Sequence, residues 1–194
     1  STKEIKLNDI ISLLRIFQNS PQVFILDTII KDGLITANID LNFDEKGKIK
    51  ENYKIQGHVK KAKLNIINRL KLQNLNFNFY VEKNTYLLKK INMTLNDIEI
   101  TSPLIEIEEQ KTSFLVKGKI LNNNKKFNIE ELKPFFSASF NNIDIREIEF
   151  GSTSNFSFNL NKKLKFNNLK MDSIVDLTKI TFGVKKLELK SYFP

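Results

Sequence analysis

Apolar and polar residues alternate one by one over long parts of this chain, and the alternation is clearest between residues 33 and 59. Ile35 and Ile39 fall on odd positions, whereas Thr36 and Asn38 fall between them on even positions. Successive side chains of a strand point to opposite faces of a sheet. The pattern therefore predicts strands with one apolar face and one polar face.

A short turn joins two such runs. The first run extends from Leu34 to Phe43, the second from Ile49 to Val59, and Asp44-Glu45-Lys46-Gly47 lies between them. Asp and Gly favour chain reversals because Asp bonds to nearby backbone and Gly tolerates positive φ. Two alternating runs joined in this way predict an antiparallel hairpin.

The alternation recurs to the C-terminus, as short apolar runs at intervals of about 8–12 residues. Turns are expected at Glu82–Thr85 and Asn122–Lys126, and a bulge or break at Asn96-Asp97. Pro103 is expected at a strand start or a bend, because proline cannot donate to a central ladder. This spacing predicts a mainly β fold, and from the residues alone both a closed sandwich or barrel and an open apolar sheet remain.

Near the N-terminus apolar residues recur at helical spacing instead, which predicts a helix at about 8–18. Ser20-Pro21 supplies an N-cap and a proline at the first helical position. A second short helix is therefore expected at about 21–31, ended by Gly33. The competing interpretation is a strand from Val23 to Ile30, which its β-branched residues would favour.

One seven-residue pattern occurs twice. Tyr53–Val59 and Phe114–Ile120 both have an aromatic residue first, a β-branched residue third, Gly fifth and a β-branched residue seventh. Two occurrences in a strand-rich chain are compatible with either a structural repeat or coincidence.

The chain carries little that points to chemistry. Its net charge is +9, but lysines are dispersed as singles and pairs, which favours solvated strand faces over nucleic-acid binding. There is no cysteine, and the single histidine, His58, falls on a polar position beside lysine. Glu106, Glu108 and Glu109 alternate with or follow isoleucines, as on a solvated strand. We expect no enzyme, no cofactor, no metal and no nucleic-acid partner.

The short helix from Pro21 to Gly33, the extended run after it, the acidic turn at Asp44–Gly47 and a strand of the kind seen at Tyr53–Val59 occur in a characteristic order. This order resembles the AsmA-like superfamily, which includes the TamB-type bridge-like envelope proteins. The similarity covers about residues 21–120, and only the general strand pattern continues beyond it.

The resemblance implies a long curved antiparallel sheet that forms an open apolar groove, or β-taco, preceded by one or two short helices. Residues 1–32 would be a helical lead-in and residues 33–194 a continuous β-groove, with a subdivision near 122–135 left open. About fourteen strands at ~4.8 Å spacing would make the groove roughly 65 Å long.

Members of the superfamily are implicated in moving phospholipids towards the outer membrane. The resemblance thus implies a segment of a bacterial envelope protein that binds acyl chains and supports lipid transport between the inner and outer membranes, and so outer-membrane biogenesis. It would lie in the periplasm, in a protein anchored to the inner membrane by a segment outside this chain. Phospholipids would be its partners, with membranes reached through flanking segments.

A lipid track needs continuous apolar surface, on which each buried CH₂ contributes about 0.8 kcal/mol. Apolar-face residues of the strands are expected to supply it: Ile35, Ile39, Leu41, Phe43, Tyr53, Ile55, Val59, Leu75, Phe77, Phe79, Val81, Phe114 and Val116. The alternative is a structural or adhesion β-sandwich without a ligand, in which the same residues pack in a closed core.

Overall fold

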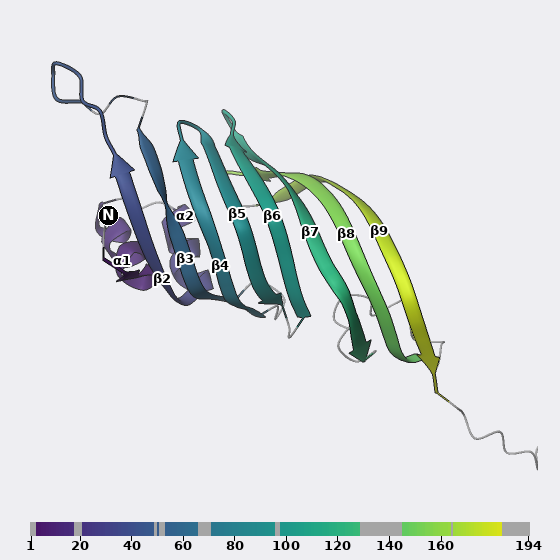
Figure 1. The fold of residues 1–194 in the computed structure, drawn as a ribbon. Coiled ribbons are helices and arrows are strands. Elements are labelled where there is room, and N and C mark those ends of the chain that lie inside the picture. Colours follow the sequence, from purple (N-terminus) through teal and green to yellow (C-terminus); the bar gives the residue numbers. More distant parts are fainter. Residues whose placement is uncertain are drawn as a thin grey trace, which may run out of the picture.

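A computed structural model describes residues 3–17, 21–48, 50, 53–65, 71–95, 98–128, 145–163 and 165–183. These residues form a mainly β fold made of a single antiparallel sheet and two short helices (Figure 1). In the described part of the chain the sheet has nine strands, which are adjacent in the order of the sequence. The sheet does not close on itself, because its first and last strands do not pair. The predicted fold class is confirmed.

The bounds of the elements follow from the backbone hydrogen bonds. The helices are α1 (Leu7–Phe17) and α2 (Pro21–Ile29). The strands are β1 (Ile5–Lys6), β2 (Ile30–Asp40), β3 (Lys54–Asn65), β4 (Lys71–Glu82), β5 (Thr85–Leu95), β6 (Ile98–Glu109), β7 (Ser113–Asn128), β8 (Ile145–Asn161) and β9 (Phe166–Phe182).

The strands are longer and fewer than the sequence suggested. Strands β8 and β9 have 17 residues each, where short apolar runs had indicated several separate strands. Eight spacings of about 4.8 Å make the nine-stranded sheet roughly 38 Å wide, so the expected fourteen strands and 65 Å are not found in the described residues. The predicted segments within 129–144 and 184–194 lie outside them.

Both helices form at the predicted places, and the competing strand at Val23–Ile30 is wrong. However, Gly33 does not end a helix, because α2 ends at Ile29 and Gly33 lies inside β2 with φ of 142°. A Cβ built on Gly33 would lie 2.6 Å from Leu7 Cδ1 and 3.0 Å from Ala62 Cα. The glycine therefore permits close contact between β2, β3 and the start of α1.

The predicted turn at Asp44–Gly47 is confirmed. The Asp44 carboxylate accepts hydrogen bonds from the backbone N–H groups of Lys46 and Lys48, at 2.9 and 2.8 Å. The Gly47 N–H donates to the Asp44 carbonyl at 3.0 Å, and Gly47 has a positive φ of 76°. This is the local chemistry for which Asp and Gly are favoured at a reversal.

Three non-glycine residues in the middle of strands have a left-handed backbone: Lys61 in β3, Asn74 in β4 and Lys90 in β5. The pairing register shifts near each of them, which defines β-bulges. Each bulge changes the parity of the apolar positions while the apolar residues stay on one face. Val59 and Ala62, on either side of Lys61, both belong to the same apolar cluster.

Of the bulge or break expected at Asn96-Asp97, the break is confirmed and the bulge is wrong, because β5 ends at Leu95 and β6 begins at Ile98. Those two residues lie outside the described part of the chain, but Leu95 and Ile98 on either side are cross-strand partners. The chain therefore reverses between β5 and β6, and the parity change occurs earlier in β5, at Lys90.

The turn expected at Asn122–Lys126 is also wrong, because these residues lie within β7. They pair with β8, with a register shift between Asn122 and Lys125, and the Asn122 amide donates to the Phe150 carbonyl at 3.3 Å. Pro103 lies in β6 beside the register shift between Thr101 and Ile105, which fits the predicted bend.

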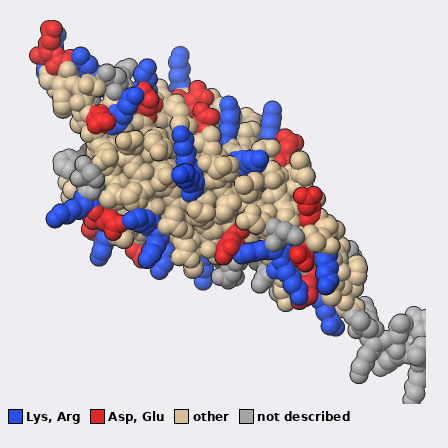
Figure 2. Space-filling model, viewed as in Figure 1, with Lys and Arg blue, Asp and Glu red and all other residues tan. Residues whose placement is uncertain are grey.

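Charged residues gather at the rims of the sheet. In the view of Figure 2 most Lys, Arg, Asp and Glu side chains stand along the two edges where the strands end, and the middle of the face carries few. Several pair across neighbouring strands, such as Lys125 with Glu99 at 2.6 Å. Such cross-strand pairs account for part of the dispersed lysines, whereas others, such as Lys89 and Lys117, lie inside strands.

Candidate functional site

The pairing register brings apolar residues from distant parts of the chain into rows across the sheet. One row has Cα partners on seven consecutive strands, β2 to β8: Ile39, Ile55, Val81, Tyr86, Ile107, Val116 and Phe158. Paired residues of an antiparallel sheet lie on the same face. The row therefore forms a continuous apolar band.

The next row extends from β2 to β9: Ala37, Gly57, Phe79, Leu88, Ile105, Gly118, Phe156 and Met171. Its two glycines are the fifth residues of the seven-residue pattern that occurs twice in the sequence. In both places the glycine is the register partner of a phenylalanine on the following strand.

The phenylalanine rings lie over these glycines. A Cβ on Gly57 would be 2.8 Å from Phe79 Cζ, and a Cβ on Gly118 would be 2.6 Å from Phe156 Cζ. The two copies of the pattern thus share a structural role, which is to let an aromatic ring approach the backbone closely. We call the surface formed by these two rows and their neighbours the apolar face.

Residues of the apolar face are buried in the middle of the sheet as well as near the helices: Val116 of β7 is 7% exposed and Phe79 of β4 is 9% exposed. Val59, Ala62 and Phe79 form a buried cluster, and Leu7 of α1 packs against it. The helices lie on one side of the sheet at the β2–β3 end, behind the strands in Figure 1. At the opposite end Met171 of β9 is 58% exposed. The helices therefore cover one end of the apolar face, and the other end is open to solvent.

Most residues expected to line a groove lie together on this face. The register joins Ile35 to Val59 and Phe77, and it joins Phe114 to Leu160 of β8. Leu75 packs against the same cluster as Phe77. Leu41 and Phe43 do not belong to the rows, because they lie beyond the end of β2. They are 42% and 55% exposed.

Polar groups border the apolar face where β3 begins and β6 ends. The Tyr53 hydroxyl donates to the Lys83 carbonyl at 3.3 Å, and Lys162 lies 3.6 Å from the Glu109 carboxylate. Burial, followed by the Glu109 and Tyr53 charges, raises the pKa of Tyr86 above its usual value. The sequence did not single out this rim, because its members come from turns and strand ends far apart in the chain.

The opposite face is polar and carries the other residues considered as candidates. His58 contacts the Thr36 hydroxyl, 2.8 Å from its Nε2, and the Lys89 ammonium lies 4.7 Å from the centre of the Tyr80 ring. A shallow depression of about 390 Å³ beside Tyr80 and one of about 510 Å³ beside Lys170 lie over strand ends.

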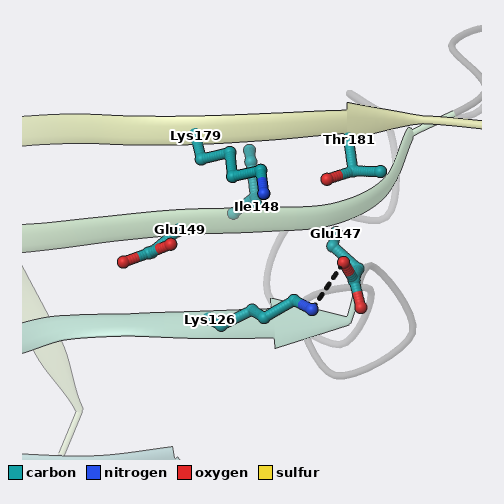
Figure 3. A pocket seen from close by; sticks show the side chains of 6 residues that line it. All are labelled: Lys126, Glu147, Ile148, Glu149, Lys179 and Thr181. Atoms are coloured by element: carbon teal, nitrogen blue, oxygen red, sulfur yellow. Dashed lines mark ion pairs between the residues drawn. The ribbon is translucent and has the colours of Figure 1, made fainter.

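A smaller hollow of about 60 Å³ lies between β7, β8 and β9 (Figure 3). Lys126 and Glu147 point toward each other at its edge, with Nζ 2.7 Å from Oε2. Lys179, Glu149 and Thr181 complete its polar lining. A space of this size holds water molecules and no larger ligand, so we do not regard it as a binding site.

In the described ranges no group of three His, Asp or Glu residues lies close enough together to hold a metal ion. Neither helix in this part of the chain has the length and apolar character needed to span a bilayer. No family model, curated protein or solved structure matches the chain. The fold and the apolar face define it as a single-layer, open antiparallel sheet protein.

Proposed function

We propose that this chain binds the acyl chains of phospholipids on the apolar face, as a segment of an AsmA-like protein that supports lipid transport between the two membranes of a bacterial envelope. The observation that carries the proposal is the row of apolar residues from Ile39 to Phe158, which crosses seven strands without a charged residue. A soluble sheet seldom leaves such a surface without a partner.

The proposed ligand fits the chemistry of this face. Acyl chains need contact with apolar side chains and no hydrogen-bonding group, and each buried CH₂ contributes about 0.8 kcal/mol. The two rows supply aliphatic and aromatic side chains at the ~4.8 Å spacing of adjacent strands. A lipid lying across the strands would therefore meet a similar surface at every step, which favours movement over tight binding.

The polar rim gives the head group a place near water. Glu109 lies two residues after Ile107 at the end of β6, and Lys162 lies just after the end of β8, two residues after Leu160. Their side chains are 3.6 Å apart. A zwitterionic head group has an ammonium and a phosphate that match a carboxylate and a lysine. We infer that head groups lie along this rim and acyl chains lie across the rows.

The experiment is native mass spectrometry of the purified chain, combined with lipid extraction of the same sample. We expect phospholipid bound in more than one stoichiometry. The variant Phe77→Asp places a charge on the apolar face and should reduce lipid occupancy, because burying an unpaired carboxylate costs several kcal/mol. Asn78→Asp introduces the same charge one residue away on the polar face and should leave occupancy unchanged.

Phe77 packs against the buried cluster, so a charge at this position also destabilises the fold. A second variant is therefore placed at a site where the fold tolerates a charge. Ile39 lies in the apolar row but is 54% exposed, so Ile39→Asp should fold, with Asn38→Asp as its control. Circular dichroism checks that each variant is folded. Unchanged lipid occupancy in a folded apolar-face variant, or a folded wild-type chain that never carries lipid, would refute the proposal.

The alternative function, a ligand-free structural or adhesion sandwich, requires a second sheet over the apolar face. The described strands form one sheet, and we know of no feature among them that favours the alternative. In such a sandwich Ile39→Asp would unfold the domain instead of releasing lipid.

A further inference from the structure

The last strand of the sheet, β9, has an unusual edge. It is 17 residues long, pairs with β8 on one side, and no strand of the described chain pairs with its other side (Figure 1). Apolar side chains on both of its faces are exposed, including Met171 at 58%, Ile174 at 71% and Val175 at 56%. Long, apolar, open edges pair readily with another strand.

The opposite edge of the sheet differs. There β1 pairs with β2, and α1 also contacts β2. However, β1 covers only Leu34 and Ile35 of this edge. Self-pairing of β9 still closes at two copies, because each chain has one β9 and a two-fold contact uses the same surface on both partners.

The middle of β9 is complementary to itself. From Lys170 to Leu177 it pairs with β8 without a register shift, so this stretch is a regular strand. Suppose that β9 of a second copy pairs with it in antiparallel orientation, with the two-fold axis at Ser173. Lys170 of one copy then lies opposite Asp176 of the other, and Met171 lies opposite Val175. Each of these pairs occurs twice because of the two-fold symmetry.

Two kinds of alternative register are worse. A shift of the axis by one residue, to Ile174, would place Asp172 opposite Asp176, and like charges directly opposite one another are destabilising. An axis between two residues would pair even positions with odd ones. The apolar face of one copy would then continue into the polar face of the other, which exposes apolar surface on both sides.

We propose that two copies of this chain associate through antiparallel pairing of their β9 strands about Ser173. The two sheets then join into one, with both apolar faces on the same side, because the two-fold axis is perpendicular to the sheet. Pairing supplies partners for the backbone groups along the edge of β9 and covers exposed apolar side chains of that strand.

The first test measures the mass of the full chain in solution by light scattering over a range of concentrations. We expect a monomer–dimer equilibrium with the dimer at twice 22.6 kDa. Lys170→Asp or Asp176→Lys should each weaken dimerisation about tenfold, since each places two like-charge pairs across the interface. The double variant Lys170→Asp/Asp176→Lys should restore it.

Lys165→Asp is the matched control, because it makes the same charge change outside the paired stretch and should have no effect. Lys170, Asp176 and Lys165 are all exposed, so these variants should fold. A chain that is monomeric at every concentration overturns the proposal. So does a dimer that the charge changes do not affect, or an assembly that grows beyond two copies.

A second test uses the absence of cysteine from the sequence. In Ser173→Cys the new thiol meets its own copy at the axis, so mild oxidation should give a disulfide-linked dimer. Ile174→Cys lies one residue away on the same edge, but its counterpart is on the diagonal, about 7–8 Å away, too far for a disulfide. Equal cross-linking of both variants would overturn the register. If the chain stays monomeric but binds an added peptide along the edge of β9, the partner of that edge is a strand of a different protein, and the proposed dimer is wrong.

Discussion

Replacing Gly57 with alanine should destabilise the sheet, because the added Cβ has no room. It would overlap the Thr36 carbonyl oxygen and would lie 2.8 Å from Phe79 Cζ and 2.9 Å from Ala37 Cα. Two of these three atoms belong to the backbone of β2, so strands β2 and β3 would have to separate locally. Overpacking of this kind costs about 1–3 kcal/mol.

The destabilisation caused by overpacking is partly offset by an effect of the same substitution on the unfolded chain. Glycine inside a strand is less favourable than alanine by roughly 0.5–1 kcal/mol, because it loses more conformational freedom on folding. The net loss of stability for Gly57→Ala should thus be about 1–2 kcal/mol. With a urea m-value of about 2 kcal/mol/M, the unfolding midpoint should fall by roughly 0.5–1 M.

Gly118→Ala is the matched comparison, since Gly118 occupies the same position in the repeated pattern. Its added Cβ would meet Phe156 Cζ at 2.6 Å, Phe156 Cε1 at 2.9 Å and Ile105 Cγ1 at 3.0 Å. All three are side-chain atoms, and the two nearest lie at the far end of the Phe156 ring, which can rotate at a cost of about 0.5–1.5 kcal/mol, so the net change should be close to zero. Urea unfolding followed by circular dichroism compares the two variants. A Gly57→Ala midpoint equal to that of the wild type, or a larger loss for Gly118→Ala, would refute the reasoning.

Two further predictions concern the rim and the first hairpin. Burial and the nearby Glu109 charge raise the pKa of Tyr86 above its usual 10.0, so the stability that the neutral phenol supplies is present below pH 10 and is lost as pH rises through the folded pKa. Tyr86→Phe should reduce this alkaline loss, as measured by unfolding at a series of pH values; an identical loss would contradict the assignment. Asp44→Ala removes the acceptor of two backbone hydrogen bonds and should cost about 1–2 kcal/mol in urea unfolding, whereas Asp44→Asn keeps that oxygen and should lose less; equal losses would argue against the turn.

The sequence predicted which residues share the apolar face better than it predicted where strands end. Alternation around Ile35 and Phe77 identified the face correctly, because a strand with one buried side must keep its apolar residues two positions apart. The short helices were also predictable, since the Ser20-Pro21 start signal acts locally.

Strand ends were less predictable, because the deciding contacts are between strands. The polar run Asn122–Lys126 has the composition of a turn, yet β8 supplies hydrogen-bond partners along it and a bulge absorbs the irregularity. Glycine is the residue type that commonly ends a helix, yet Gly33 lies in β2, where the absence of a side chain permits close contact with Leu7 and Ala62. Local propensity is a weak signal wherever a long-range partner satisfies the backbone.

By itself the sequence determined the β class, the apolar and polar faces and the first hairpin, because side-chain alternation and turn chemistry act within a few residues. Tertiary structure alone decided how the strands line up. The left-handed residues Lys61, Asn74 and Lys90 shift the register so that apolar positions of changing parity remain on one face. Only that alignment places Gly57 beneath Phe79 and forms rows across the sheet, because a row depends on pairing between residues that are far apart in the chain.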